Sequence, residues 1–152
     1  MSNDTYIAAL RMLARRELSE AQVRQRLARR GESQESIDEA IARLKSDRSI
    51  DDERVAGAIA RTQAAGRNRG RRRVLQQIEA AGIDKSIASR AVDQVFEDLD
   101  PDALLSASLE KRLHGRDRIA DDREFQRLFR YLSAQGFESD KILAHLRKYQ
   151  QR

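Results

Sequence analysis

Arginine is the residue type in this 152-residue chain whose number and spacing best suit a chemical role. Six arginines and no acidic residue occur between residues 61 and 73: Arg61, Arg67, Arg69, Arg71, Arg72 and Arg73. A guanidinium group forms paired hydrogen bonds to phosphates and carboxylates. Gly66 and Gly70 would give the backbone of this cluster freedom, and the N–H groups of a helix that starts here would also attract anions. The cluster predicts an anion-binding site, with a solvated loop as the alternative.

A second basic set lies nearer the C-terminus and contains Lys111, Arg112, Arg116, Arg118, Arg123, Arg127, Arg130, Arg147 and Lys148. Within it, Arg123, Arg127 and Arg130 have i, i+4 and i+7 spacing, which places them on one face of a predicted helix. That face points to solvent if the apolar residues between them pack inward. We predict that these three arginines also contact a partner or DNA. A face that is only solvated is the default interpretation of such spacing, and contact is the further hypothesis.

The overall charge agrees with an anionic partner. The net charge is +5, the isoelectric point is near 10.0, and only 5 of the 30 basic residues are lysine. A bias toward arginine fits recognition of a polyanion, although a GC-rich genome would produce the same bias. Acidic residues are segregated too, because five of them and no basic residue occur between Asp93 and Asp102.

Asp51 and Asp52 precede a predicted helix. An Asp at this position can accept hydrogen bonds from the free N–H groups of the first turn, and its charge suits the positive end of the helix. A structural capping role is therefore our main interpretation, and contact with a partner is the alternative.

Signatures of enzymes and of metal or cofactor sites are missing from the sequence. There is no cysteine, no phosphate-binding glycine loop, and no ligand-like spacing around His114 and His145. We therefore expect no catalytic residue, no metal and no cofactor. The four Phe residues fit core positions and Trp is absent, which argues against base-specific stacking. The sequence has no apolar run long enough to span a bilayer, and its N-terminus does not resemble a signal peptide. We therefore expect a cytoplasmic protein without a membrane partner.

The elements that position these residues are predicted to be helices almost throughout. One pattern recurs three times and ends at Gly31, Gly82 and Gly136. It consists of an apolar residue, a second apolar residue four positions later, and a glycine four positions after that. Each glycine is placed to end a helix in the left-handed conformation. A polar start signal and a second amphipathic segment follow each glycine, and another helical stretch precedes each pattern, over residues 3–16, 51–65 and 101–113.

The repeated pattern predicts an all-α fold: an elongated, curved array of three tandem three-helix repeats. The predicted units are residues 1–49, 50–100 and 101–152. Internal breaks are expected at residues 16–19, 66–70 and 114–120.

Four segments in order resemble the motifs of the RecX family. Residues Ile50-Asp51-Asp52-Glu53-Arg54-Val55-Ala56 resemble its "IDDxRFA" signature, and residues 70–83 resemble its "G…I…L…GI" segment. The opening residues 9–31 and the closing residues 131–142, which include Tyr131-Leu132-Ser133-Ala134-Gln135-Gly136-Phe137, resemble its first and last motifs. Val55 stands where Phe is usual, and Gln135 where Arg is usual.

The resemblance implies a non-enzymatic modulator of the RecA recombinase. Members of the family bind the RecA filament on DNA and usually inhibit its ATPase and strand exchange, in the regulation of DNA repair, recombination and the SOS response. The expected partners are thus RecA and single-stranded or double-stranded DNA, bound by a monomer. Two alternatives remain open: a stand-alone, sequence-tolerant DNA-binding protein of helix-turn-helix-like units, and a protein scaffold that does not bind nucleic acid.

Overall fold

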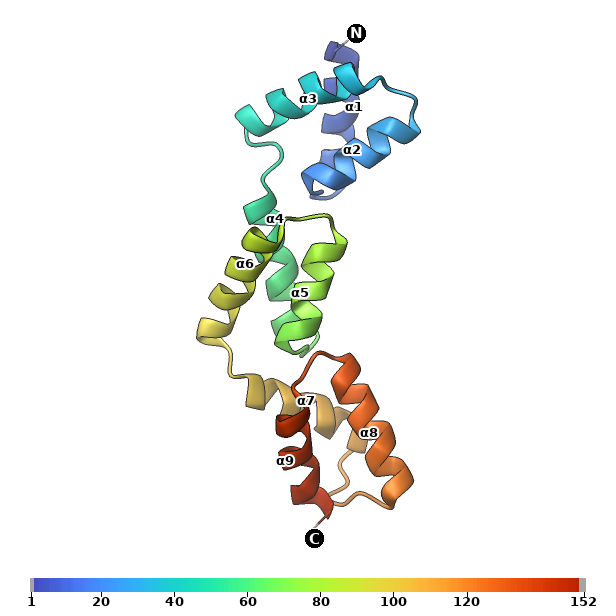
Figure 1. Cartoon of the computed structure of the whole chain (residues 1–152), viewed down its shortest axis with the longest axis vertical. Helices are drawn as coiled ribbons and strands as arrows, with labels where there is room; N and C mark the ends of the chain where they lie inside the picture. The colour runs from blue at the N-terminus through green and yellow to red at the C-terminus, as the bar shows by residue number, and fades with distance from the viewer. Residues whose placement is uncertain (1, 151–152) are drawn as a thin grey trace.

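A computed structural model describes residues 2–150 of the chain, and Figure 1 shows its helices in three groups along an elongated row. The outermost residues of the predicted first and third units, Met1, Gln151 and Arg152, lie outside the described residues. Residues 2–150 contain no strand. Their elements are α1 (Ser2–Arg15), α2 (Glu20–Arg29), α3 (Gln34–Ser46), α4 (Asp52–Arg61), the π-helical turn η1 (Thr62–Gly66), α5 (Arg71–Ala80), α6 (Lys85–Asp98), α7 (Pro101–Leu113), α8 (Asp122–Ala134) and α9 (Ser139–Gln150). This all-α helical repeat is the predicted fold class.

Polar side chains and glycines set the helix boundaries. Ser19 begins α2 with a capping box to Gln22, and Pro101 follows the N-cap Asp100 at the start of α7. Ser33 and Asp84 cap α3 and α6. The three repeated glycines follow α2, α5 and α8 with positive φ angles of 90°, 79° and 100° for Gly31, Gly82 and Gly136. The breaks expected within each group are the connections between α1 and α2, η1 and α5, and α7 and α8.

The first helix of the middle group differs from the simple helix expected over residues 51–65. Its α-helical part ends at Arg61, and the chain continues through the wider turn η1 to Gly66. Beyond this turn the chain folds back, and the Arg69 N–H donates to the Gln63 carbonyl at 3.1 Å. The Ser108 hydroxyl on α7 donates to the carbonyl of Asn68 at 2.9 Å. The connection before α5 is therefore held by both the second and third groups.

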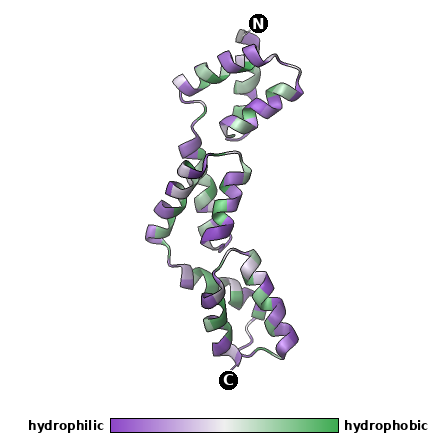
Figure 2. Ribbon diagram, viewed as in Figure 1, coloured by the Kyte–Doolittle hydropathy of each residue, from purple (hydrophilic) through white to green (hydrophobic). Residues whose placement is uncertain are grey.

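Buried side chains form two hydrophobic clusters. One cluster belongs to α1–α3 and includes Leu27 and Leu44, while the other extends over α4–α9 and includes Ile78, Leu105 and Leu132. Figure 2 shows hydrophobic and hydrophilic residues alternating along the helices, as expected where each helix buries one side. The second and third groups thus share a core, and the first has its own.

The second helices of the three groups, α8, α5 and α2, follow one another end to end along the row (Figure 1). At the start of α5, the N–H of Gly70 donates to Gln135 O at 2.8 Å and the N–H of Arg72 donates to Gly136 O at 3.3 Å. At the start of α2, the Ser19 hydroxyl donates to the carbonyl of Ala81. Each junction therefore joins the N-terminus of one second helix to the C-terminus of the next group's second helix.

No helix in residues 2–150 is both long and apolar enough to span a membrane.

Candidate nucleic-acid interface

The loop before α5 and the first turn of that helix bring three arginines to the junction between the second and third groups. Arg67 is exposed, whereas Arg69 and Arg73 are half-buried. Burial, followed by the charges of Arg73 and Arg67, lowers the pKa of Arg69. Within residues 2–150, the buried Nε atoms of Arg69 and Arg73 have no hydrogen-bond partner. We call Arg67, Arg69 and Arg73 the junction arginines, and their mutual repulsion favours binding of an anion beside them.

Two further arginines of the cluster, Arg71 and Arg72, have structural contacts. Arg71 forms an ion pair with Asp93 on α6, which joins the basic and acidic runs of the sequence. Arg72 Nη2 donates to the carbonyl and hydroxyl oxygens of Ser133, at 2.7 and 3.3 Å. Both side chains border a hollow lined also by Leu75, Val92 and Phe137. Arg71 and Arg72 are exposed but already have partners within the protein, and their contact with an anion stays a prediction.

Gly70 does not give the backbone of the arginine cluster the freedom that we predicted from the sequence. It is buried, it is the N-cap of α5, and its φ angle of −79° is open to any residue. A Cβ atom at this position would lie 2.6 Å from the Gly136 carbonyl. Glycine is therefore required for close backbone packing and not for flexibility.

Arg61 lies apart from the junction arginines. It ends α4, and a Cβ atom on Gly57 would lie 3.3 Å from its Nη1. Its side chain lines a hollow between α4 and α6 together with Asp98 and Leu99. None of the junction arginines lines this hollow, and a partner contact of Arg61 stays a prediction.

The three predicted arginines of α8 are all exposed. Leu128 and Leu132 are buried behind them, and Phe125 and Phe129 are partly buried against the core. Arg127 and Arg130 line a hollow between α7 and α8, which we call the α7–α8 hollow; its other lining residues are Arg112, Glu124, Leu128 and Tyr131. Arg123 does not line this hollow.

Tyr131 was not identified as a site residue from the sequence. The guanidinium carbon of Arg112 lies 3.9 Å from the centroid of its ring, a cation–π contact between α7 and α8. The carbonyl of Tyr131 accepts the N–H of Gln135 at 3.0 Å, and the carbonyl of Gln135 accepts the N–H of Gly70 at 2.8 Å, so Tyr131 lies one helical turn from the start of α5. Tyr131 thus connects the two basic sets. Arg112 belongs to the second basic set predicted from the sequence. Its contact with Tyr131 could not be predicted, because the positions of the two residues in the sequence do not indicate that they lie together.

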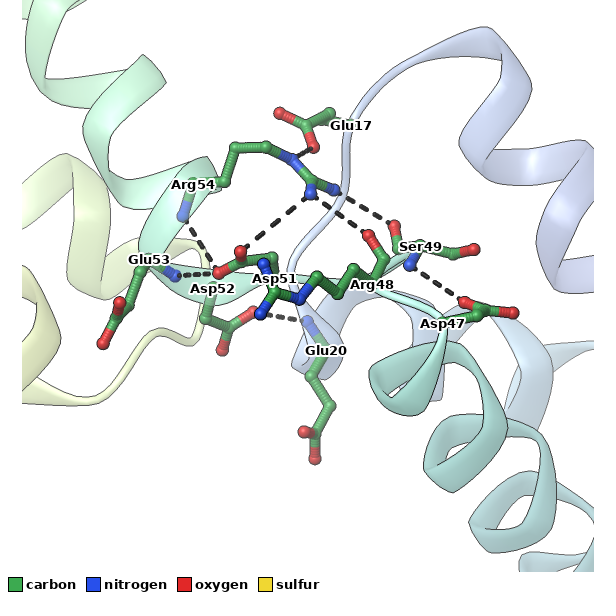
Figure 3. A network of polar contacts seen from close by, with 9 residues as sticks. All are labelled: Glu17, Glu20, Asp47, Arg48, Ser49, Asp51, Asp52, Glu53 and Arg54. Carbon is green, nitrogen blue, oxygen red and sulfur yellow. Dashed lines mark hydrogen bonds and ion pairs between the residues drawn. The ribbon is translucent and has the colours of Figure 1, made fainter.

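Asp51 is the N-cap of α4, where its Oδ1 accepts the N–H groups of Glu53 and Arg54 at 3.1 and 3.2 Å (Figure 3). The Arg54 side chain pairs with Glu17 and donates to the carbonyls of Arg48 and Ser49. This network fixes the connection between α3 and α4.

Asp52 has a different contact. Its Oδ1 accepts the backbone N–H of Glu20 at 2.9 Å, which ties the start of α4 to the start of α2 (Figure 3). Burial raises the pKa of Asp52, and the hydrogen bond from Glu20 acts against that change. The acidic pair thus holds one helix start and one junction between groups.

The described part of the chain contains no group of three or more His, Asp or Glu side chains arranged to hold a metal ion. His145 lies 3.5 Å from an Asp102 oxygen and 3.3 Å from the Ser106 hydroxyl.

Comparison with known sequences gives a consistent family relationship. The family model described as RecX, first three-helix domain, matches residues 6–44. A regulatory protein RecX from Syntrophotalea carbinolica is 34% identical over 137 residues, which cover 90% of both chains. Another from Halorhodospira halophila is 33% identical over 138 residues, covering 90% of this chain and 83% of the relative.

Solved structures show the same fold. The crystal structure of RecX from Lactobacillus salivarius matches with a TM-score of 0.80 at 21% identity and covers 96% of each chain. A second crystal structure of a regulatory protein RecX matches with a TM-score of 0.77 at 20% identity, over 96% of this chain and 71% of that one.

Proposed function

Because this chain belongs to the RecX family of regulatory proteins, we propose that it binds the filament of RecA recombinase on DNA and inhibits its ATPase and strand exchange. It acts without catalysis of its own, as a monomer in the cytoplasm, in the control of DNA repair, recombination and the SOS response.

The observation that supports this proposal best is the cationic surface at the junction of the second and third groups. The N–H of Gly70, next to Arg69, donates to the carbonyl of Gln135 at the end of α8. The junction arginines therefore lie near the helix whose Arg130 and Tyr131 line the α7–α8 hollow, although residues 67 and 130 are far apart in the sequence. A surface of this sign, extended over two groups, suits a polyanionic filament. The elongated row adds reach, because separate contacts along one filament strengthen each other.

ATP hydrolysis by RecA on single-stranded DNA, titrated with this protein at two salt concentrations, tests the proposal. We expect the protein to reduce hydrolysis, and less so at the higher salt concentration. A variant with four substitutions, R67A, R69A, R127A and R130A, should require about tenfold more protein for the same effect.

A control variant removes the same charge elsewhere, from the exposed arginines of the first group: R16A, R26A, R29A and R30A. It should inhibit about as strongly as the wild-type protein. Equal loss in both variants would mean that net charge alone matters. Tight binding to bare DNA with no change in RecA activity would identify a stand-alone DNA-binding protein instead.

A further inference from the structure

The α7–α8 hollow has the size and shape of a small ligand site. Its volume is about 370 Å³, near the lower end of the range of roughly 300–1,000 Å³ for such sites. It opens between α7 and α8 and is lined by three arginines, Arg112, Arg127 and Arg130.

Among the described residues that line the hollow, the one carboxylate is already engaged. Glu124 accepts hydrogen bonds from Arg116 at 3.0 and 2.8 Å and from the Ala120 N–H at 2.9 Å. The bonds from Arg116, followed by the one from Ala120, lower the pKa of Glu124, so it stays ionised and paired. Arg127 lies at the limit of ion pairing with it, at 4.0 Å. Within residues 2–150, Arg112 and Arg130 form no ion pair, so the hollow keeps an excess of positive charge.

Tyr131 fixes the direction of one of these charges. A free arginine side chain loses conformational entropy when it binds a ligand, and the ring under Arg112 reduces that loss by holding the guanidinium in place. The half-buried ring packs against the core shared by α4–α9. Arg112 covers one face of the Tyr131 ring, so that face is not open to stacking by a nucleobase. This favours contacts to the backbone of a nucleic acid over contacts to its bases.

We infer that the α7–α8 hollow binds the phosphodiester backbone of single-stranded nucleic acid, with Arg112, Arg127 and Arg130 contacting phosphates and Tyr131 positioning Arg112. The inference rests on the proposed function and assigns roles to Arg112, which the sequence placed only within the wider second basic set, and to Tyr131, which the sequence did not identify. The strand continues past Tyr131 toward the junction arginines. A phosphodiester chain carries one charge at every step, so it can satisfy both basic sets in succession, whereas an acidic peptide would need a matching sequence.

The test measures binding of a labelled oligothymidylate by fluorescence anisotropy across a range of salt concentrations. R112A should weaken binding about tenfold and reduce the slope of log affinity against log salt by about 1. R29A, which removes one exposed charge from the first group, should change neither quantity.

Substitutions of Tyr131 separate positioning from charge. Y131L should weaken binding by about two- to fivefold, the effect of losing an exposed cation–π contact, and leave the salt slope unchanged because every charge remains. Y131F keeps the ring and should restore wild-type affinity. The chain has three tyrosines and no tryptophan, so a change in tyrosine emission on binding that disappears in Y131F would place the strand beside this ring.

Far-UV circular dichroism and thermal unfolding test whether Y131L folds. R112A tests the site even if Y131L does not fold, because Arg112 is exposed and its substitution should leave the fold intact. Wild-type affinity and slope in R112A would overturn the inference. Equal competition by polyglutamate would contradict its commitment to phosphodiesters. If either of these two contradicting results occurred while the protein still inhibited RecA, the inference about the hollow would fail and the proposed function would not. If the variants behaved as expected but RecA were unaffected, the proposed function would fail and the site would stand.

Discussion

Gly70 lies directly against Gly136, so that a Cβ atom on Gly70 would be 2.6 Å from both the carbonyl carbon and the carbonyl oxygen of Gly136. The contact joins the N-terminus of α5 to the end of α8, and the Gly70 N–H donates to the neighbouring Gln135 carbonyl. Two backbones can approach this closely only where neither residue has a side chain. The junction arginines take their place beside α8 because of this contact.

Substitution of Gly136 tests how strongly the contact constrains the fold. Gly136 and Gly31 both have positive φ angles, so alanine at either should cost about 1–2 kcal/mol of stability. A Cβ atom on Gly136 would also lie 2.3 Å from Arg73 N, whereas nothing lies within 4 Å of one on Gly31. We expect G136A to lose roughly 1–3 kcal/mol more than G31A in urea unfolding. Equal losses would show that the junction yields freely.

Removal of the Asp51 cap should lower stability without affecting function. D51A leaves two N–H groups of α4 without their acceptor and should cost about 0.5–2 kcal/mol in thermal or urea unfolding. E53A removes an exposed carboxylate from the same turn, whose ion pair with Arg90 is also exposed, and should cost less than about 1 kcal/mol. Lost RecA inhibition at unchanged stability would instead indicate that Asp51 contacts a partner.

The half-buried carboxylate of Asp52 predicts a pH effect of defined sign. Burial raises the pKa of Asp52 in the folded state, so folding favours its protonated form. Its contribution to stability is present below the unfolded pKa of about 3.9 and is lost as pH rises through the higher folded value. Asn can still accept the Glu20 N–H but does not titrate.

We therefore expect the stability of the wild-type protein relative to D52N to fall as pH rises from below about 3.9 through the higher folded pKa of Asp52. Melting temperatures of both proteins at matched ionic strength measure this difference. A wild-type protein that gained stability over D52N with rising pH would show that the Asp52 carboxylate is favoured by its surroundings.

The two hydrophobic clusters predict how the chain unfolds. Leu27 and Leu132 are both fully buried, and alanine at either should cost about 2–5 kcal/mol. Because Leu132 belongs to the cluster shared by α4–α9, L132A should increase hydrogen exchange in α4–α6 as well as in α7–α9. L27A should increase it mainly in α1–α3. Exchange confined to residues 101–150 in L132A would instead support three independent units.

Much of the fold could be predicted because its signals are local. Ser33, Asp84 and Asp100 act within one turn of the helix they begin, and the repeated glycines end helices whose apolar residues lie just before them. The division into units at residues 49/50 and 100/101 remains a prediction.

The candidate site could be predicted only in part, because its contacts join distant segments. Arg72 bonds Ser133, Arg71 pairs with Asp93, and Arg112 packs on Tyr131. Spacing along the chain shows which arginines share a helix face, but it does not show which of them another group will engage. The role of Gly70 was mistaken for the same reason, since the residue it touches is 66 positions away.

The end-to-end row of α8, α5 and α2 has an electrical consequence. The partial positive charge at the start of a helix and the partial negative charge at its end offset each other where two helices meet, so the row acts as one long dipole. Charges that suit helix ends are found at its outer limits, with Asp122 in the first turn of α8 and Arg29 in the last turn of α2. The first turn of α5 has no acidic residue and carries three arginines. There the carbonyls of Gln135 and Gly136 accept the free N–H groups at the helix start, as an acidic side chain does at other helices. The first turn of α5 can therefore carry basic side chains.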